Sequence, residues 1–256
     1  MVKALSEELV AVITGGGKGI GKSIAQELAK TGAHIVICAR NEDDLKKVCE
    51  DIRRSNGKCD YNVVDVTSKQ DVEKFVESVI MKYGRIDVLV NNAGFANGKK
   101  YIESVTDDEY ENYFETNVHS VFYFLRKVIP EMKSQNSGLI INVSSQSGLH
   151  ASPIMPIYSA NKFAIEAFTE AVAKEFEESG CNAKCIAICP SGVNTEMRVK
   201  LFGLEDAKLQ QSPDVVGKVV SDIVLTKIDV PNGANVHIRN GSVAKIDDVL
   251  YDWRSK

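Results

Sequence analysis

Residues 9–39 read LVAVITGGGKGIGKSIAQELAKTGAHIVICA and decide the fold class. The apolar run at residues 9–13 predicts a buried strand, and the pattern at 22–30 predicts a helix that stops at Gly32. Residues 34–39 predict a second strand, which completes a strand–helix–strand unit. Its glycine-rich turn lies where backbone N–H groups and a helix N-terminus bind the pyrophosphate of a dinucleotide. We therefore predict a nucleotide site at this turn.

The glycine spacing is T-G-x-x-x-G-x-G, carried by Thr14, Gly15, Gly19 and Gly21. This differs from the usual G-x-G-x-x-G spacing, and a flexible turn is the alternative. The position between a strand and a helix favours nucleotide binding. We expect the cofactor to contact the residues of this turn, namely Thr14, Gly15, Gly17, Lys18, Gly19, Ile20 and Gly21.

The end of the second strand indicates which cofactor binds. An NAD site usually has an acidic residue here to hold the ribose 2′-hydroxyl. This chain has Arg40 and Asn41 instead, with Lys18 in the glycine turn. Cations suit the 2′-phosphate of NADP through charge-assisted hydrogen bonds, although both could be solvated surface charges. The sequence favours NADP(H), with NAD(H) possible.

Strand and helix patterns then alternate along the rest of the chain. Helices are expected at 45–55, 72–83, within 106–135 and from about 158 to 179, and strands at 59–64, 86–90, 139–143, 183–189 and 235–238. Such alternation predicts a mostly parallel sheet with helices on both faces. The expected fold class is α/β, a Rossmann-type doubly wound sheet in a single domain over residues 1–256. Asp65, after the third strand, is placed to meet the adenine.

Composition excludes several classes of partner. The 256 residues carry a formal net charge of −4, which argues against nucleic acid or an anionic membrane as the main partner. No run approaches the ~20 apolar residues that span a bilayer, and the first residues lack a signal-peptide pattern. The six cysteines include no Cys-x-x-Cys pair, so no metal site is predicted. We expect reduced thiols and a cytoplasmic location.

A second stretch, SSQSGLHASPIMPIYSANK at residues 144–162, carries the chemistry. Tyr158 and Lys162 are four residues apart, so they share one face of a helix. An ammonium beside a phenol favours the phenolate, and we expect Lys162 to lower the pKa of Tyr158. Ser145, at the end of a strand, could meet the phenol across a pocket, an arrangement that suits proton transfer to or from a substrate oxygen.

The Tyr–Lys spacing alone is weak, since Tyr123 and Lys127 repeat it inside a hydrophobic helix. There the simpler interpretation is a packed tyrosine and a solvated lysine. Only Tyr158 has companions in order along the chain. The motifs are Thr14-Gly15-x3-Gly19-Ile20-Gly21, Asp65-Val66, Asn91-Asn92-Ala93-Gly94, Asn117, Ser145, Tyr158-x3-Lys162 and Pro190-Ser191-Gly192-Val193-x-Thr195.

With these motifs the chain resembles the short-chain dehydrogenase/reductase family over nearly its whole length. The resemblance implies that Tyr158 is the general acid in reduction and the base in oxidation, that Lys162 lowers its pKa and holds the nicotinamide ribose, and that Ser145 polarises the substrate oxygen. Asn117 would anchor a water chain to Lys162. The cofactor would also contact Asp65, Val66, Asn91, Ala93, Gly94, Pro190, Gly192, Val193 and Thr195. The implied activity is an NADP(H)-dependent interconversion of a carbonyl and a secondary alcohol.

Two segments are expected to face the substrate, residues 147–155 and a lid at about 195–212. Both are more apolar than charged, which predicts a neutral carbonyl or alcohol of modest size. A surface helix is the alternative for the lid. His150 could be a base, but a loop histidine is more often a wall or surface residue.

Two other functions remain as alternatives. Relatives that reduce 3-oxoacyl groups on acyl carrier protein have basic residues near the end of the Tyr–Lys helix, whereas residues 175–179 here are acidic. A non-catalytic NADP(H)-binding sensor would not need Tyr158 and Lys162. The chain end from Asn240 to Trp253 also differs from that of the carrier reductases.

The helices around Asn117 and Tyr158 contain more apolar residues than a single core-facing stripe requires. This excess predicts a homodimer or homotetramer.

Overall fold

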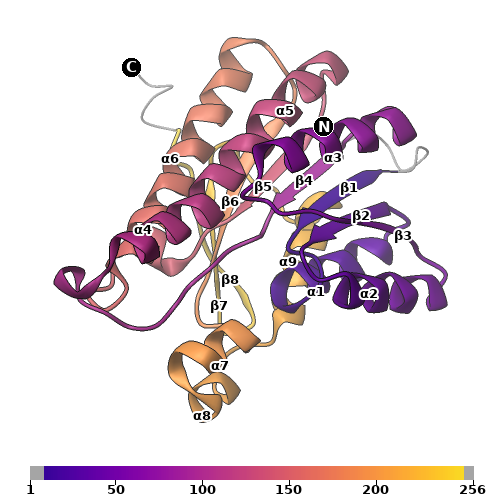
Figure 1. The fold of residues 1–256 in the computed structure, drawn as a ribbon. Helices are drawn as coiled ribbons and strands as arrows, with labels where there is room; N and C mark the ends of the chain where they lie inside the picture. The colour runs from indigo at the N-terminus through magenta and orange to yellow at the C-terminus, as the bar shows by residue number, and fades with distance from the viewer. Residues whose placement is uncertain (1–8, 251–256) are drawn as a thin grey trace.

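The computed structural model describes residues 9–250. The beginning of the chain, considered above for a signal peptide, and Trp253 lie outside this range. Within it the fold class predicted above is confirmed: one α/β domain with a mostly parallel sheet (Figure 1). None of the helices between residues 9 and 250 is long and apolar enough to cross a lipid bilayer.

One eight-stranded sheet organises this part of the chain, in the order β3-β2-β1-β4-β5-β6-β7-β8. Neighbouring strands from β3 to β7 are parallel, and β8 pairs antiparallel with β7. The order reverses between β1 and β4, so their carboxyl ends open the crevice where α/β folds bind nucleotides. The strands are β1 (Val10–Thr14), β2 (His34–Ala39), β3 (Lys58–Val63), β4 (Val88–Asn91), β5 (Leu139–Val143), β6 (Lys184–Pro190), β7 (Asn235–Arg239) and β8 (Ser242–Asp247).

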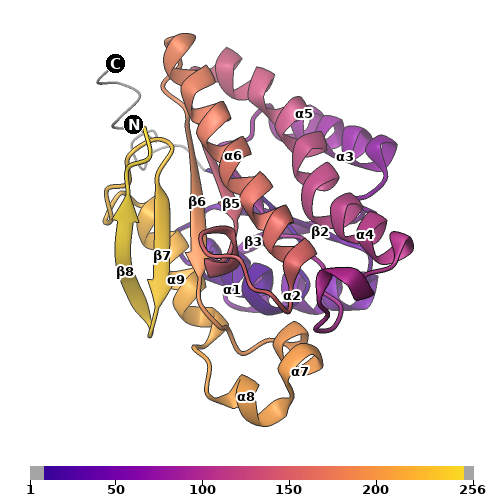
Figure 2. The ribbon, with the colours of Figure 1, turned by 90° about the vertical axis from the view of Figure 1, so that its left-hand side faces the viewer.

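Helices cover both faces of this sheet (Figures 1 and 2). One face is covered by α1 (Gly19–Ala29), α2 (Glu42–Arg54) and α9 (Pro213–Val224), and the other by α3 (Lys69–Tyr83), α5 (Ser120–Gln135) and α6 (Pro156–Glu178). A short π-helix, η2 (Glu115–His119), joins α4 (Asp107–Phe114) to α5. Two short helices, α7 (Glu196–Phe202) and α8 (Leu204–Lys208), lie beyond the carboxyl edge of the sheet (Figure 2).

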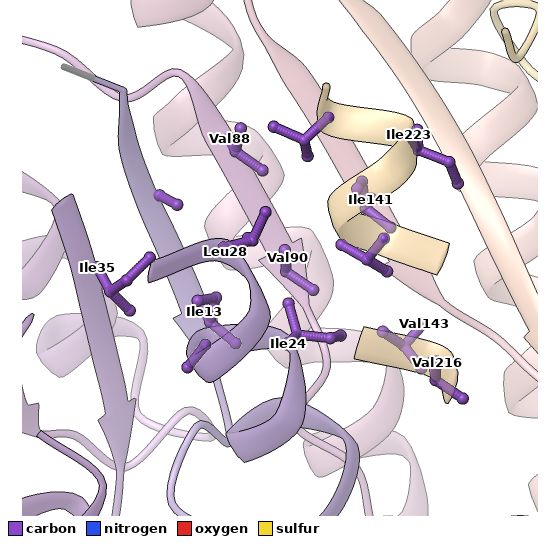
Figure 3. Packing of buried hydrophobic residues seen from close by; sticks show 14 of the residues in the cluster. Ile13, Ile24, Leu28, Ile35, Val88, Val90, Ile141, Val143, Val216 and Ile223 are labelled. Carbon is purple, nitrogen blue, oxygen red and sulfur yellow. The ribbon is translucent and has the colours of Figure 1, made fainter. Parts of the chain in front are cut away.

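Two apolar cores result from the alternation of side chains along the strands. On β1, Ala11 and Ile13 belong to the core with α1 and α9, while Val10 and Val12 belong to the core with α3 and α5. Figure 3 shows the first core, in which Ile24 packs among strand residues. Strands buried on both faces are continuously apolar, which is why the sequence predicts them well.

Two elements are absent from the expectations above. Helix α9 begins at Pro213 after the N-cap Ser212, and packs so closely on α1 that a Cβ at Gly217 would lie 2.5 Å from Ser23 Oγ. Strand β8 is an edge strand whose residues are mostly exposed or half-buried. Its composition therefore lacks the apolar run by which the inner strands are recognised.

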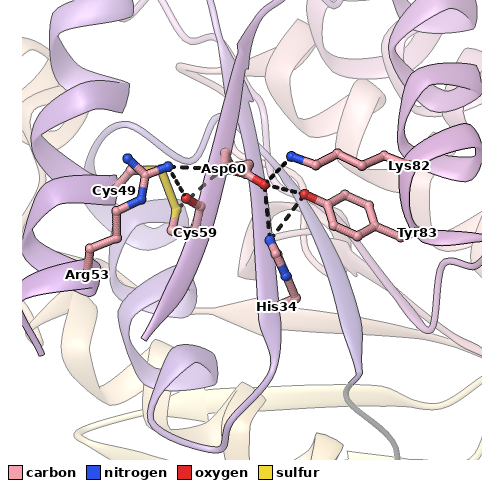
Figure 4. A network of polar contacts seen from close by, with 7 residues as sticks. All are labelled: His34, Cys49, Arg53, Cys59, Asp60, Lys82 and Tyr83. Carbon is pink, nitrogen blue, oxygen red and sulfur yellow. Dashed lines mark hydrogen bonds and ion pairs between the residues drawn. A yellow bond between two sulfur atoms is a disulfide. The ribbon is translucent and has the colours of Figure 1, made fainter. Parts of the chain in front are cut away.

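The prediction of reduced thiols is wrong for one pair of cysteines. Cys49 of α2 and Cys59 of β3 form a disulfide, with 5.1 Å between their Cα atoms (Figure 4). Cys49 lies on the buried face of α2, and this face packs on β3, so the two residues meet in space although ten positions separate them. The cysteines consequently give no support to the predicted cytoplasmic location.

Candidate active site

A cavity of about 390 Å³ lies at the carboxyl edge of the sheet. Segments that are far apart in sequence line it, since parallel strands bring their following loops to one edge. They are the start of α1, the loop after β5, the first turn of α6, the loop after β6 and helix α7. The lining residues that the sequence analysis selected are Ile20, Ser145, Ser147, Ser152, Ile154, Met155, Tyr158, Pro190, Gly192, Val193, Thr195, Met197, Leu201 and Phe202.

Tyr158 and Ser145 both line this cavity, and the Ser145 hydroxyl interacts with the phenol. Ser145 directly follows the buried Ser144 at the end of β5, and its hydroxyl also accepts a hydrogen bond from Ser147 N at 3.1 Å. Burial raises the pKa of Tyr158 to about 12, and the Ser145 hydroxyl counteracts only part of this effect. The phenol therefore holds its proton at neutral pH, as the acid of a reduction must.

The direction of this pKa shift corrects the expectation that Lys162 lowers the pKa of Tyr158. The Lys162 Nζ lies 5.5 Å from the centroid of the Tyr158 ring and donates to the Val143 carbonyl oxygen at 2.7 Å. Lys162 is 6% exposed, and burial lowers its own pKa to about 8. Desolvation disfavours the charged forms of both groups, and Lys162 is not among the groups that lower the pKa of Tyr158.

Asn117 is buried in η2 and joins two parts of the site. Its Oδ1 accepts from Phe95 N at 2.7 Å, and its Nδ2 donates to Phe95 O at 2.9 Å and to Asn161 Oδ1 at 3.1 Å. The side chain thus fixes the loop after β4 against α6. Single turns of π-helix are frequent at functional sites. The water chain at Asn117 stays a prediction.

The glycine turn after β1 is shaped by Asn92, which belongs to a motif quoted above but is not among the residues expected to bind the cofactor. Asn92 Nδ2 donates to Thr14 O at 2.8 Å and to Gly15 O at 3.2 Å. Thr14 is buried, and its hydroxyl accepts from the N–H groups of Asn92 and Ala93 at 2.9 Å each. Thr14 therefore holds β1 to the end of β4. The repeated asparagine at 91–92 is the signal that could have identified Asn92.

The start of α1 fits the pyrophosphate of a dinucleotide. Among residues 9–250 no side chain caps the N-terminus of α1, and no acid lies in its first turn, whereas Asn41 caps α2 and Ser68 caps α3. Uncapped N–H groups and the helix dipole attract an anion. Gly19 has a φ of 52° and approaches the Thr195 side chain, so the turn leaves no room for larger residues.

The residues expected to read the adenosine half lie around α2. Arg40 is exposed and makes no ion pair within the described part of the chain. Asn41 accepts from Asp44 N at 2.9 Å as the cap of α2. Lys18 pairs with Asp44 and with Glu196 of α7, both at 3.2 Å, so its charge is already compensated. These contacts leave Arg40 as the better candidate for a 2′-phosphate.

Other residues predicted to bind the cofactor shape the edge of the sheet. Asp65 accepts from Thr67 N and Oγ1 in the turn after β3, beside the buried Val66. Asn91 Nδ2 donates to Asn142 Oδ1 at 2.8 Å. A Cβ at Gly94 would lie 3.4 Å from Asn117 Oδ1, which places this glycine directly beside Asn117.

The segment predicted as a lid leaves the sheet after β6, and its two ends are joined by backbone contacts. Val193 forms a β-bridge with Gln211, and Asn194 N donates to Gln211 O at 2.9 Å. Between them, Thr195 caps α7 by accepting from Arg198 N at 3.2 Å. Arg198 Nη2 lies 3.0 Å from Asp206 Oδ2, and the guanidinium stacks 3.8 Å from the centroid of the Phe202 ring. His150 is exposed and does not line the cavity.

This geometry is that of a nicotinamide-dependent oxidoreductase, with a dinucleotide groove beside a cavity that contains the Ser145 and Tyr158 hydroxyls. Residues 9–205 match the family model described as short chain dehydrogenase. The chain therefore belongs to the short-chain dehydrogenase/reductase family and acts on carbonyl and alcohol groups.

Known relatives include enzymes with either nicotinamide cofactor. The NADPH-dependent pterin aldehyde reductase of Arabidopsis thaliana is 34% identical, over 89% of this chain and 92% of the relative. The crystal structure of levodione reductase superposes with a TM-score of 0.84 at 26% identity, covering 91% of this chain and 96% of the other. The 3-ketoacyl-(acyl-carrier-protein) reductase of Brucella melitensis, complexed with NADH, has a TM-score of 0.83 at 26% identity and coverage of 91% and 97%.

Proposed function

We propose that this protein is an NADP(H)-dependent reductase of a neutral carbonyl compound of modest size. The observation that carries the proposal is the Ser145–Tyr158 hydroxyl pair in a cavity with a mainly apolar lining. The cation in this lining, Arg198, is paired with Asp206 and stacked on Phe202, so its charge is compensated without a substrate. A polyanionic substrate would have to compete with Asp206.

The side chains divide the work of the reduction. The Ser145 hydroxyl donates a hydrogen bond to the carbonyl oxygen and polarises it, and Tyr158 transfers its phenolic proton to that oxygen as negative charge develops. Lys162, fixed by Val143 O, is positively charged below a pKa of about 8 and stabilises the phenolate that remains. The bound nicotinamide supplies the hydride.

The preference for NADP(H) rests on Arg40. Its side chain follows β2 at the carboxyl edge of the sheet, where a 2′-phosphate would lie, and it is exposed and unpaired within residues 9–250. An acidic residue that would select the 2′-hydroxyl of NAD is absent from this position.

The deciding experiment measures NADPH and NADH oxidation across ketones, aldehydes, diketones, steroids and a 3-oxoacyl thioester. Turnover of neutral carbonyls with NADPH, lost in Tyr158→Phe, supports the proposal. Efficient turnover of only the thioester would favour the carrier reductase instead. That alternative is weakened by Lys133, which is paired with Glu175 at 2.7 Å, next to the acidic end of α6. Binding of NADPH without any turnover would favour a sensor.

Self-association is a separate proposal. Phe122 of α5 and Phe163 of α6 are 43% and 45% exposed, a large apolar area on two neighbouring helices. We propose that this face is covered in a homodimer or homotetramer. Light scattering at micromolar concentration should give a mass above that of one chain, and a monomeric mass would contradict the proposal.

A further inference from the structure

Glu166 is a half-buried acid that the mechanism above does not use. It lies one helical turn beyond Lys162, so Tyr158, Lys162 and Glu166 follow one another at intervals of four on the same face of α6. Its Oε2 is buried and makes no hydrogen bond to any group in the described part of the chain. An unsatisfied buried carboxylate oxygen is costly and calls for a functional explanation.

The groups around Glu166 come from three neighbouring strands or their ends. Cys189 Sγ, at the end of β6, lies 3.3 Å from Glu166 Oε1. Ser144, directly after β5, and His237 of β7, which is paired with Asp247 at 2.8 Å, both favour the ionised form of this carboxyl group. Of the charged or titratable groups facing Glu166, Lys162 is the one that is both buried and part of the proton-transfer site.

We propose that Glu166 is a positioning residue for the reaction, whose carboxylate keeps the buried Lys162 ammonium charged and thereby sets the pH range in which Tyr158 can work. The inference rests on the proposed function. Burial lowers the pKa of Lys162, and the charge of Glu166 opposes that effect. Burial in turn raises the pKa of Glu166, while Ser144, Cys189 and Lys162 counteract it. At any pH at which both groups are ionised, each stabilises the charged form of the other.

The helix also contains a matched control. Glu170 lies one further turn along α6 and is paired with Lys174 at 2.6 Å, with its side chain 42% exposed. Glu170 is also an acid on α6 and is four residues from Glu166, as Lys162 is on the other side, but its side chain is in contact with solvent. Removing its charge should leave Lys162 almost unaffected, because exposed charges are screened.

The test is a titration that requires no substrate. Protein labelled with ¹³C at lysine Cε is titrated by NMR, and the Lys162 signal is assigned by its loss in Lys162→Met. In Glu166→Gln we expect the pKa of Lys162 to fall by about one unit, the size expected for loss of a nearby opposite charge. Glu166→Asp retains the charge and should restore most of the wild-type value, and Glu170→Gln should match wild type. An unchanged pKa of Lys162 in Glu166→Gln would overturn the proposal.

Two further readouts separate this inference from the proposed function. If wild type reduces carbonyls, the alkaline limb of its pH profile should move to lower pH in Glu166→Gln and stay in place in Glu170→Gln. If wild type reduces nothing, the proposed function fails, and the lysine titration still decides the role of Glu166. Should Glu166→Gln not fold, titration of Cδ-labelled glutamate in wild type answers the question. A Glu166 carboxyl that ionises below the pKa of Lys162 supports the proposal, and one that stays protonated through that pKa overturns it.

Discussion

Two of the clusters that contain a tyrosine and a lysine lie at opposite ends of the parallel strands, at the amino edge and the carboxyl edge of the sheet. At the amino edge, Asp60 of β3 accepts hydrogen bonds from Tyr83 and from Lys82 at 2.7 Å, and lies 3.1 Å from His34 (Figure 4). At the carboxyl edge, Tyr158 lies beside the Ser145 hydroxyl, and Lys162 donates to the Val143 carbonyl oxygen.

The difference lies in the compensation of charge. Burial alone would raise the pKa of Asp60, but hydrogen bonds from Lys82, Tyr83 and His34 hold it well below its usual range. At the carboxyl edge, burial raises the pKa of Tyr158 and lowers that of Lys162, and the charge of Glu166 offsets only part of the effect on Lys162. The compensated cluster is typical of a structural ion-pair network, while the incompletely compensated one has the perturbed pKa values that are typical of functional sites.

The largest expected effect distinguishes the two tyrosines. Tyr158→Phe should lower kcat by about 10²- to 10⁴-fold, because it removes the general acid. Tyr83→Phe should leave kcat unchanged and lower the free energy of unfolding by about 1 kcal/mol, the typical loss of one hydrogen bond. Steady-state kinetics and urea unfolding of both variants check this pair. Comparable losses of activity in the two would break the comparison.

The disulfide beside Asp60 should affect stability alone. Reduction of Cys49–Cys59, or Cys49→Ser, should lower the free energy of unfolding by about 2–3 kcal/mol, the loop-closure entropy of so short a loop. We expect kcat and the Michaelis constant for the cofactor to stay at wild-type values, since the disulfide is away from the cavity lining. Denaturant unfolding with and without reductant measures the first effect. A parallel loss of cofactor affinity would show that the amino edge also supports the site.

The burial of Lys162 should be visible in the pH dependence of the free energy of unfolding. Its pKa is 10.5 in the unfolded chain and about 8 in the folded protein, so between these values the unfolded chain binds more protons and stability rises with pH. From pH 7 to 9.5 the wild type should gain about 2 kcal/mol relative to Lys162→Met. Urea titrations at both pH values test this. A constant difference between the two proteins would mean that Lys162 is not desolvated.

The smallest expected effect concerns cofactor choice. Arg40→Ala should weaken NADPH binding by about tenfold, through loss of one charge-assisted hydrogen bond, and leave NADH binding unchanged. Lys18→Ala serves as the comparison, because Lys18 is already paired with Asp44 and Glu196 and should change the preference less. Dissociation constants from nucleotide titrations decide between them. A larger change for Lys18 would reverse the assignment.

Most of the sheet could be predicted from sequence because its inner strands are continuous apolar runs. Strand β8 has no such run, and α9 was not recognised although Ser212 and Pro213 mark its start. The spacing of Tyr158 and Lys162 correctly places them on one helix face. The spacing of two residues does not show how far they are desolvated, or that the Val143 carbonyl binds the Lys162 ammonium. The predicted direction of the Tyr158 pKa shift is therefore wrong.

Contacts that depend on packing between elements could not be predicted either. The Cys49–Cys59 disulfide requires that α2 and β3 meet in one register, and sequence separation alone does not show this. The same is true of Glu166, whose neighbours come from the ends of β5 and β6 and from β7. The family motifs identify residues that follow a common order along the chain. They do not identify residues that are brought together only by the packing of separate elements.

The backbone contacts that join the two ends of the segment at 193–211 have a consequence for the evolution of substrate range. The bridge between Val193 and Gln211 and the hydrogen bond from Asn194 to Gln211 involve backbone atoms, so they do not depend on the side chains between them. Helices α7 and α8 can therefore accumulate insertions or be exchanged for another segment while β6, β7 and the cofactor groove keep their register. We expect that changes in this region can alter substrate specificity without changes to Ser145, Tyr158 and Lys162.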